Sequence, residues 1–305
     1  MWFKNLMVYR LPAGWSLSAP ELEARLERHA LQPCSPFEML SRGWVAPAES
    51  ARLVHTVNQQ LLVALGVNQK LLPASIIRQE AAVRAEALAQ SQGFPVGRRQ
   101  MRELKMKVTE ELRARAFTRR RITRAWIDPA AGWCVVDAAS PGKAEEVIEA
   151  LRDALDSFAV QPLDTQRTAH TSMAAWLTHG DAPGRFRIDQ DLELQSADKS
   201  KAMIRYTRHP LEGPEIRSHL STGKYPTRLG LTWNDRVAFV LTEKLQIKRL
   251  EFLEMSREAA AESEIEAAEQ FDIDFTVMCG ELVKLLEELV QSLGGENVQP
   301  QAAAA

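Results

Sequence analysis

The distribution of hydrophobic and polar residues predicts strands and helices in alternation over most of this chain. The apolar segment 2–11 predicts a first strand, which ends at Pro12. Ser18 and Glu21 stand at the spacing of a capping box, so a helix is expected to begin there. Residues 55–67 alternate loosely between apolar and polar side chains. Because Asn68 and Gln69 follow them, a hairpin with its turn at these two residues is expected.

Residues 76–121 differ from their surroundings because their apolar residues recur with helical spacing. The first helix is expected to use Ile76, Ile77, Ala81, Val83 and Leu88. Gly93, Pro95 and Gly97 then interrupt the pattern. The second helix is expected to use Met101, Leu104, Val108 and Leu112 as its apolar face. The segment is therefore predicted to be a helical hairpin inserted between β-rich parts.

The remaining pattern predicts antiparallel hairpins and further helices. Strands are expected at 124–128 and 133–137, at 160–163, twice within 186–207 and twice within 229–253. Helices are expected at 140–155, 171–178 and 215–220, with a long helical region at 262–293. Because the regular strand–helix–strand order of a parallel sheet is missing, the expected class is α+β with mixed or antiparallel sheets. The alanine-rich tail 297–305 is expected to be disordered.

Composition places the chain among ordinary globular proteins, with 305 residues, 45% of them hydrophobic and 26% charged. Its start lacks a basic segment followed by an apolar core, so no secretory signal is expected. No apolar run approaches the ~18 residues that span a bilayer, so no membrane association is expected. The three cysteines lie far apart, which favours a reduced, cytoplasmic protein without a disulfide framework or zinc site.

Charge is distributed unevenly, although the net charge of -2 excludes a uniformly basic protein. Residues 98–124 hold 11 basic and three acidic residues, whereas residues 251–296 hold 13 acidic and two basic ones. Long cations beside a helical apolar face suit a phosphate backbone, because each ion pair releases a condensed counterion. A solvated helix face is the alternative. The candidate phosphate contacts are Arg98, Arg99, Arg102, Lys105, Lys107, Arg113, Arg115, Arg119, Arg120 and Arg121.

A second basic segment lies within 199–228, where an aromatic residue, Tyr206, is interleaved with arginines as on many nucleic-acid surfaces. Its candidate contacts are Lys201, Arg205, Arg208, Lys224 and Arg228. Lys248 and Arg249 form a smaller basic cluster. Contacts of this kind reach phosphates without reading bases, so the expected binding is independent of sequence.

Two apolar features allow more than one interpretation. Phe117, continued on the same helix, falls about 160° from the apolar face. It could stack on a base or anchor a protein interface, or the helix could end earlier and turn Phe117 into the core. The stripe in the last helical region is either a core face or a subunit interface, with Leu282, Leu286 and Leu289 as its candidate interface residues.

Signals of enzyme chemistry are weak. Residues 221–224 resemble the end of a phosphate-binding loop, but the first glycine is missing and a tyrosine replaces the final Ser/Thr. The paired acids Asp189/Asp191 and Asp272/Asp274 could hold Mg²⁺ for a nuclease. Solvated acids on a strand or helix start explain both pairs more simply. No catalytic residue, resident metal or cofactor is expected.

Several short segments stand in an order that matches one known family. The most specific is the opening MWFKNLMVYRL over residues 1–11. The others are Arg115-Ala-Phe-Thr118, Trp126-Ile-Asp128, Val136-Asp-Ala-Ala-Ser140, Lys143-Ala-Glu145, Lys248-Arg-Leu250, Phe271-Asp-Ile-Asp-Phe275, Gly280-Glu-Leu282 and Leu293-Gly-Gly-Glu296. Over residues 1–296 the chain thus resembles the bacterial recombination-associated RdgC family.

The resemblance implies a non-enzymatic, nucleoid-associated protein that forms a closed, ring-shaped homodimer. Duplex DNA would pass through a basic central hole without regard to sequence, and single strands would bind more weakly. Occupied DNA would limit the function of RecA, so the protein would modulate recombination and replication-fork repair. The alternatives are a Mg²⁺-dependent nuclease using Asp272 and Asp274, and a scaffold that binds RecA directly.

The resemblance also divides the chain. Residues 1–75 with 122–170 would form a central α+β domain, 76–121 a helical tip, and 171–296 a base that includes the C-terminal helices. Subunits would meet at both ends of the ring. Phe117 lies in a matching segment, so the resemblance favours an interface role for it at the tip.

Overall fold

The structure is a computed structural model that describes residues 2–156, 158–253 and 266–297. Within these ranges twelve strands form one sheet in the order β2-β4-β5-β6-β1-β12-β11-β10-β8-β9, with β3 paired to β4 and β7 to β1. Every pairing between named strands is antiparallel, which confirms the α+β class. The strands are β1 (Leu6–Arg10), β2 (Leu40–Val45), β3 (Val54–Val57), β4 (Gln60–Lys70), β5 (Thr118–Asp128), β6 (Trp133–Asp137), β7 (Gln161–Pro162), β8 (Phe186–Ser196), β9 (Met203–Tyr206), β10 (Lys224–Trp233), β11 (Val237–Thr242) and β12 (Ile247–Phe252).

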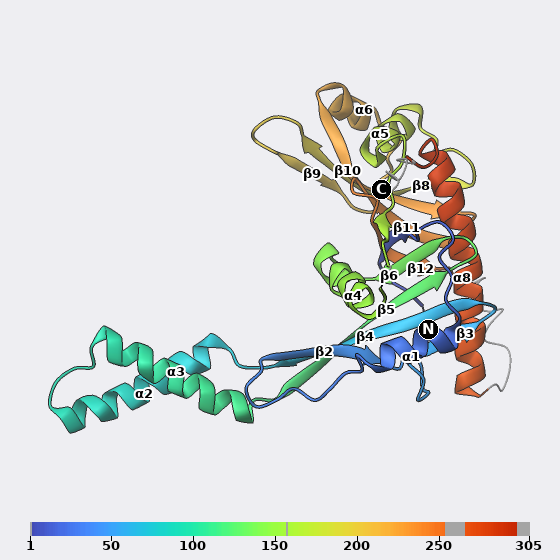
Figure 1. Ribbon diagram of the computed structural model, residues 1–305. Helices are drawn as coiled ribbons and strands as arrows, with labels where there is room; N and C mark the ends of the chain where they lie inside the picture. Colours follow the sequence, from blue (N-terminus) through green and yellow to red (C-terminus); the bar gives the residue numbers. More distant parts are fainter. Residues whose placement is uncertain (1, 157, 254–265, 298–305) are drawn as a thin grey trace, which may run out of the picture.

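Helices cover the sheet from both sides and extend it at one end (Figure 1). They are α1 (Ala19–Glu27), α2 (Ala74–Gln92), α3 (Arg98–Arg115), α4 (Pro141–Ala154), α5 (Ala169–His179), α6 (Pro214–Ser221) and α8 (Ala267–Ser292). The expected capping box is present, since the Ser18 side chain accepts from the Glu21 amide and Glu21 accepts from the Ser18 amide. In the described ranges, no helix is long and apolar enough to cross a membrane.

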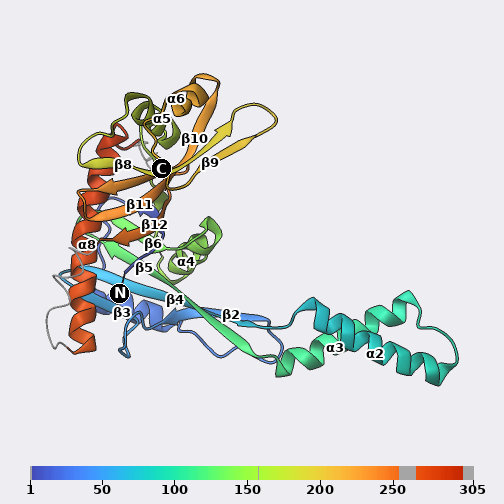
Figure 2. The same cartoon turned by 180° about the vertical axis from the view of Figure 1, so that it is seen from behind.

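The half of the sheet that contains β1 is covered on both faces. Successive side chains of a strand point to opposite sides, and here both sets are apolar. On β1, Met7 and Tyr9 join the core under α1 and α4. Leu6 and Val8 join the second core, which α8 covers from the other side. The long helix α8 therefore runs along one side of the whole molecule, and α4 lies on the other (Figures 1 and 2).

The second half of the sheet is apolar on one face only. Leu229, Leu231 and Trp233 of β10 pack into the core shared with α5, α6 and α8. The alternate residues of the same strands point to the opposite face, on the side of α4. We call this surface the open sheet face and define it by Asp191, Glu193, Arg205, Arg228, Lys248 and Arg249.

The inserted hairpin projects from the end of the sheet as an arm of two helices (Figure 2). Strands β4 and β5 stay paired up to Lys70 and Thr118, so the arm continues directly from two paired strands. Its helices pack through the buried side chains of Ala81, Ala85 and Val108. The hairpin prediction is confirmed, but its second helix ends at Arg115, and strand β5 begins at Thr118.

Several local predictions were wrong in ways that tertiary packing explains. The hairpin of β3 and β4 turns at Asn58 and Gln59, both at positive φ, because β4 runs on to pair with β5. Segment 229–253 contains parts of three strands, with an extra turn at Asn234 and Asp235. Val83 faces solvent instead of α3.

At the C-terminus, the amide of Asn297 donates to the carbonyl oxygen of Asp164, so the predicted disorder does not hold for that residue. The rest of the predicted tail, 298–305, and the start of the last helical region lie outside the described residues.

Candidate nucleic-acid interface

Helix α3 presents its apolar and basic residues on different sides, as its sequence predicts. Gly97 precedes the helix, and its amide donates to the Gln100 side chain, which satisfies one of the unpaired N–H groups of the first turn. Val108 is fully buried against α2, while Met101 and Leu104 are half-buried beside it. The helix therefore holds its cations on the surface of the arm.

Most of the predicted cations of α3 are exposed. They are Arg98, Arg99, Arg102, Lys105, Lys107 and Arg115. Arg99 pairs with Glu103 one turn later, an exposed pair worth little to stability. Within the described ranges, neither Arg98 nor Arg102 has an ion-pair partner, so both guanidinium groups are available to an anion. Arg113 differs, because it is half-buried and its Nε is enclosed by protein.

Arg119, Arg120 and Arg121 lie on a strand and not on a helix, so they point to alternate faces. Arg121 pairs with Glu146 of α4, which places it on the α4 side of the sheet, and Arg119 shares that side. Arg120 points the other way and its Nε donates to the Asn68 side chain. The sequence grouped these three residues as one basic stripe, whereas the sheet separates Arg120 from the other two.

The open sheet face holds the second basic group. Arg205 donates two hydrogen bonds, from Nε and Nη2, to one carboxylate oxygen of Glu193. Arg228 Nε lies 3.6 Å from the other oxygen, to which the Thr227 hydroxyl also donates. The Glu193 side chain is only 7% exposed, while those of Arg205 and Arg228 remain 63% and 55% exposed. The acid therefore lies beneath two solvent-facing arginines.

Lys248 and Arg249 extend this group. Arg249 Nη2 lies 2.8 Å from a carboxylate oxygen of Asp191, and Lys248 Nζ donates to the carbonyl oxygen of Ala139, two residues before α4 begins. Burial, with a smaller contribution from Arg228, lowers the pKa of Lys248. Sequence reasoning noted these two residues only as a minor cluster. Pairing with Val240 of β11 places Lys248 on the face of Arg228, and a β-bulge at Arg249, whose φ is +52°, turns Arg249 to the same face.

Electrostatics keep Glu193 ionised. Burial by itself would raise the pKa of its carboxyl, but hydrogen bonds from Arg205 and Thr227 and the charges of both arginines outweigh burial, so the pKa is lowered. At neutral pH the carboxylate therefore retains its charge and its hold on the arginines.

The other predicted cations of this segment lie around the same strands. Lys201 is exposed in the turn between β8 and β9, and Arg208 is exposed just after β9. The amide of Arg208 donates to Asp191, which links its loop to the open sheet face. Lys224 is half-buried at the start of β10.

Phe117 lies at the base of the arm with its side chain 85% exposed. The helix does end earlier, at Arg115, but the residue does not turn into the core. Its carbonyl oxygen accepts from the Leu71 amide, which fixes the backbone while the ring faces solvent. Leu71 and Leu40 are also exposed, and the antiparallel register places both on the same face as Phe117, whereas exposed Ile122 points to the opposite face. We call Phe117, Leu71 and Leu40 the patch around Phe117; exposed apolar side chains that share a face are typical of a protein interface.

The predicted interface role of the α8 leucines is wrong. Leu282, Leu286 and Leu289 are 0%, 0% and 2% exposed and belong to the chain's own core. They cannot also meet a second subunit, because α8 buries this face against its own sheet. The helical spacing could not distinguish the two outcomes, since a core stripe and an interface stripe have the same period.

The paired acids have protein partners. Asp272 lies 2.9 Å from His55 Nε2, and Asp274 accepts from the Gln270 side chain. Asp189 accepts from the Thr232 hydroxyl, and Asp191 pairs with Arg249 as described above. Within the described ranges, no group of three or more His, Cys, Asp or Glu residues is arranged to hold a metal ion.

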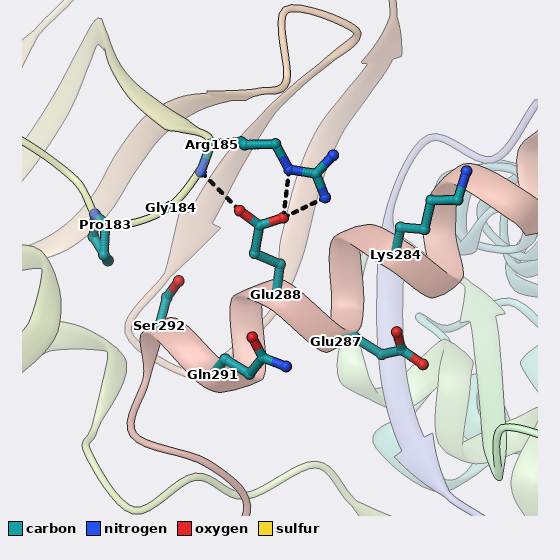
Figure 3. A pocket seen from close by; sticks show the side chains of 8 residues that line it. All are labelled: Pro183, Gly184, Arg185, Lys284, Glu287, Glu288, Gln291 and Ser292. Carbon is teal, nitrogen blue, oxygen red and sulfur yellow. Dashed lines mark hydrogen bonds and ion pairs between the residues drawn. The ribbon is translucent and has the colours of Figure 1, made fainter.

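A separate network fastens α8 to the sheet on the far side of the molecule. Figure 3 shows Glu288 accepting hydrogen bonds from the backbone amide, Nε and Nη2 of Arg185. The indole N–H of Trp233 donates to the same carboxylate. Burial alone would raise the pKa of Glu288, but these donors outweigh it and lower the pKa.

We expect Glu288→Gln to reduce the free energy of unfolding by about 1.5–3 kcal/mol at pH 7, because charged hydrogen bonds are lost. Because the folded pKa is lowered, this stability is present above the unfolded pKa of about 4.3 and is lost as the pH falls through the folded pKa. Denaturant unfolding of both proteins at pH 7 and near pH 3 measures the difference. Glu287→Gln, at the exposed neighbouring position, is the control and should change little. Equal losses in both variants would contradict the assignment.

The fold and the surface together define an α+β protein whose single sheet carries an arginine-rich helical arm. The RdgC family model, described as "Putative exonuclease, RdgC", matches residues 1–296. The Recombination-associated protein RdgC of Dechloromonas aromatica is 50% identical over 302 residues, which cover 98% of this chain and 99% of that protein. Its namesake from Janthinobacterium sp. (strain Marseille) is 47% identical over 296 residues, covering 97% and 99%. The chain belongs to the RdgC family, as the sequence resemblance predicted.

Proposed function

We propose that this protein binds duplex DNA without regard to sequence, as a ring-shaped homodimer, and thereby limits RecA-dependent recombination and acts in replication-fork repair. Single-stranded DNA is bound more weakly, and the protein is associated with the nucleoid. The recombination-associated names of its relatives support this role. The observation that carries it is the placement of unpaired cations on the arm together with exposed arginines on the open sheet face.

The shape of the chain supports ring formation. The arm, α4 and the β9 end of the sheet all project from the side opposite to α8 (Figures 1 and 2). Two such chains joined at both ends would enclose the arm cations and the open sheet face between them. The apolar patch around Phe117 supplies one contact surface, because large exposed apolar groups favour association.

We further propose that the protein acts by binding and not by hydrolysis. The paired acids that suit Mg²⁺ are each engaged by a histidine, amide, hydroxyl or guanidinium group. Incubation of supercoiled plasmid with protein and Mg²⁺ should leave the plasmid intact. Nicking or shortening of the DNA would contradict this proposal and favour a nuclease.

Sedimentation velocity with and without a short duplex tests the assembly. We expect a dimer of about 68 kDa, twice the mass of the chain, to bind one duplex of random sequence. A monomer that binds one duplex per chain would contradict the ring.

Retention on circular DNA tests threading. A closed ring on a nicked circular plasmid should survive a salt challenge that removes surface-bound protein, because screening weakens phosphate contacts but cannot open a topological link. Cutting the plasmid once should release the protein. Equal loss from circular and linear DNA in high salt would contradict threading.

A further inference from the structure

The open sheet face has a construction that the arm lacks. Each of its arginines is held from below by a carboxylate, Glu193 under Arg205 and Arg228, and Asp191 under Arg249. The acid side chains are 7% and 24% exposed, whereas the three arginines are between 55% and 71% exposed. The acids therefore lie inside the surface, and the guanidinium groups form its outer layer.

Arginines that are paired with a carboxylate still have N–H donors for a second anion. A guanidinium carries five N–H donors in a planar fork. Arg205 uses two of them on Glu193, and Arg249 uses one on Asp191, so at least three remain on each for a second anion. With Lys248, the face has four cations above two carboxylates, which leaves two net positive charges.

We infer that the open sheet face is a preorganised phosphodiester-binding site, in which Glu193 and Asp191 are positioning residues that orient Arg205, Arg228 and Arg249 toward the DNA backbone. This inference rests on the proposed function and adds to it how the arginines of the open sheet face are oriented, and by which acids. Binding here loses little side-chain freedom, because the arginines are already ordered before a phosphate arrives. Lys248 Nζ, held at Ala139, supplies a further charge beside them.

The two basic surfaces should differ in what they require of a cation. On the arm, Arg98 and Arg102 have no ion-pair partner in the described ranges, so a point charge suffices to release a counterion. On the open sheet face, one group must bind a carboxylate below and a phosphate above at the same time. Arginine has the fork to do both in a fixed geometry, whereas lysine has a single nitrogen.

Replacement of arginine by lysine distinguishes DNA binding by the arm from DNA binding by the open sheet face. We expect Arg205→Lys with Arg228→Lys to weaken binding of a 30-base-pair duplex roughly tenfold near 0.15 M salt, although the charge is conserved. Arg98→Lys with Arg102→Lys, the matched control on the arm, should change the affinity less than about twofold. Fluorescence anisotropy measures both, and thermal unfolding checks that the variants are folded. Arg249→Lys, at an exposed position above Asp191, provides an independent variant.

Two results would overturn the inference while leaving the proposed function intact. The first is full affinity in the Arg205/Arg228 lysine variant and in Arg249→Lys, with wild-type protein binding DNA normally. The second is an equal loss in the arm control, which would mean that the open sheet face has no special requirement for arginine. Failure of the wild-type protein to bind duplex DNA would instead contradict the proposed function itself.

Glu193→Gln tests the positioning role directly. The substitution makes the surface more positive. If charge alone mattered, duplex DNA would bind more tightly, whereas loss of arginine positioning would weaken the binding. We expect affinity to fall about threefold, together with loss of the slowly exchanging Nε–H signal of Arg205 in side-chain NMR spectra. Glu193→Asp, which retains the charge, should keep more of both. Tighter duplex binding by a folded Glu193→Gln variant would overturn the positioning role.

Discussion

Duplex binding is expected to weaken roughly tenfold near 0.1 M salt when Arg98, Arg99 and Arg102 are changed together to alanine. These exposed guanidinium groups lie on the first turns of α3. Each phosphate neutralised adds about −0.9 to the slope of log K against log salt, so loss of three contacts should reduce its magnitude by about 2.7 for each chain. Anisotropy titrations of a random duplex over a range of salt concentrations measure both quantities.

Lys284→Ala is the matched control, because this lysine is exposed on α8, on the far side of the sheet. It should leave affinity and slope nearly unchanged. An unchanged slope in the triple arm variant would remove α3 from the DNA interface. RecA strand exchange provides a second measurement, in which the triple variant should inhibit less. Full inhibition by a variant that no longer binds DNA would favour direct contact with RecA.

The second large effect is expected from Phe117→Ala. An exposed aromatic ring beside other exposed apolar side chains has the character of an interface hot spot, worth about 2 kcal/mol or more. The dissociation constant of the dimer should therefore rise about thirtyfold. Retention on nicked circular plasmid in high salt should be lost as well, because the ring opens more often. Sedimentation equilibrium over a range of protein concentrations measures the first quantity.

The fold itself should tolerate this change, since a side chain that is 85% exposed contributes little to the stability of one chain. Phe117→Leu keeps most of the apolar area and should retain most of the dimer. A folded Phe117→Ala protein that dimerises like the wild type would place the interface elsewhere and would leave the patch around Phe117 unexplained.

Local patterns predicted the local elements well. The spacing of Ser18 and Glu21 marked the start of α1, and the apolar face with Val108 marked α3, because both depend on contacts within one helix or one helical pair. The basic character of the arm was also visible in the sequence, since it requires only that charges be close along the chain. Element boundaries were less secure, as between Arg115 and Arg119, where the basic segment passes from helix α3 to strand β5.

Phe117 and the α8 leucines show where sequence patterns fail. A large apolar residue is expected inside, yet Phe117 is exposed, while leucines that suit an interface are buried within the chain. Helical spacing predicts that one face of α8 is apolar. Only the tertiary structure shows that the chain's own sheet covers that face. The patch around Phe117 likewise joins residues from separate strands.

What the sequence determined by itself was the family, the α+β class, the helical arm and the separation of basic from acidic segments. What only the tertiary structure decided was which cations share a surface. Arg205, Arg228 and Arg249 come from three strands, and buried Glu193 and half-buried Asp191 join them only when β8, β9, β10, β11 and β12 pair. The physical reason is that charge along a chain is a local property, whereas the orientation of a guanidinium group depends on partners that distant strands supply.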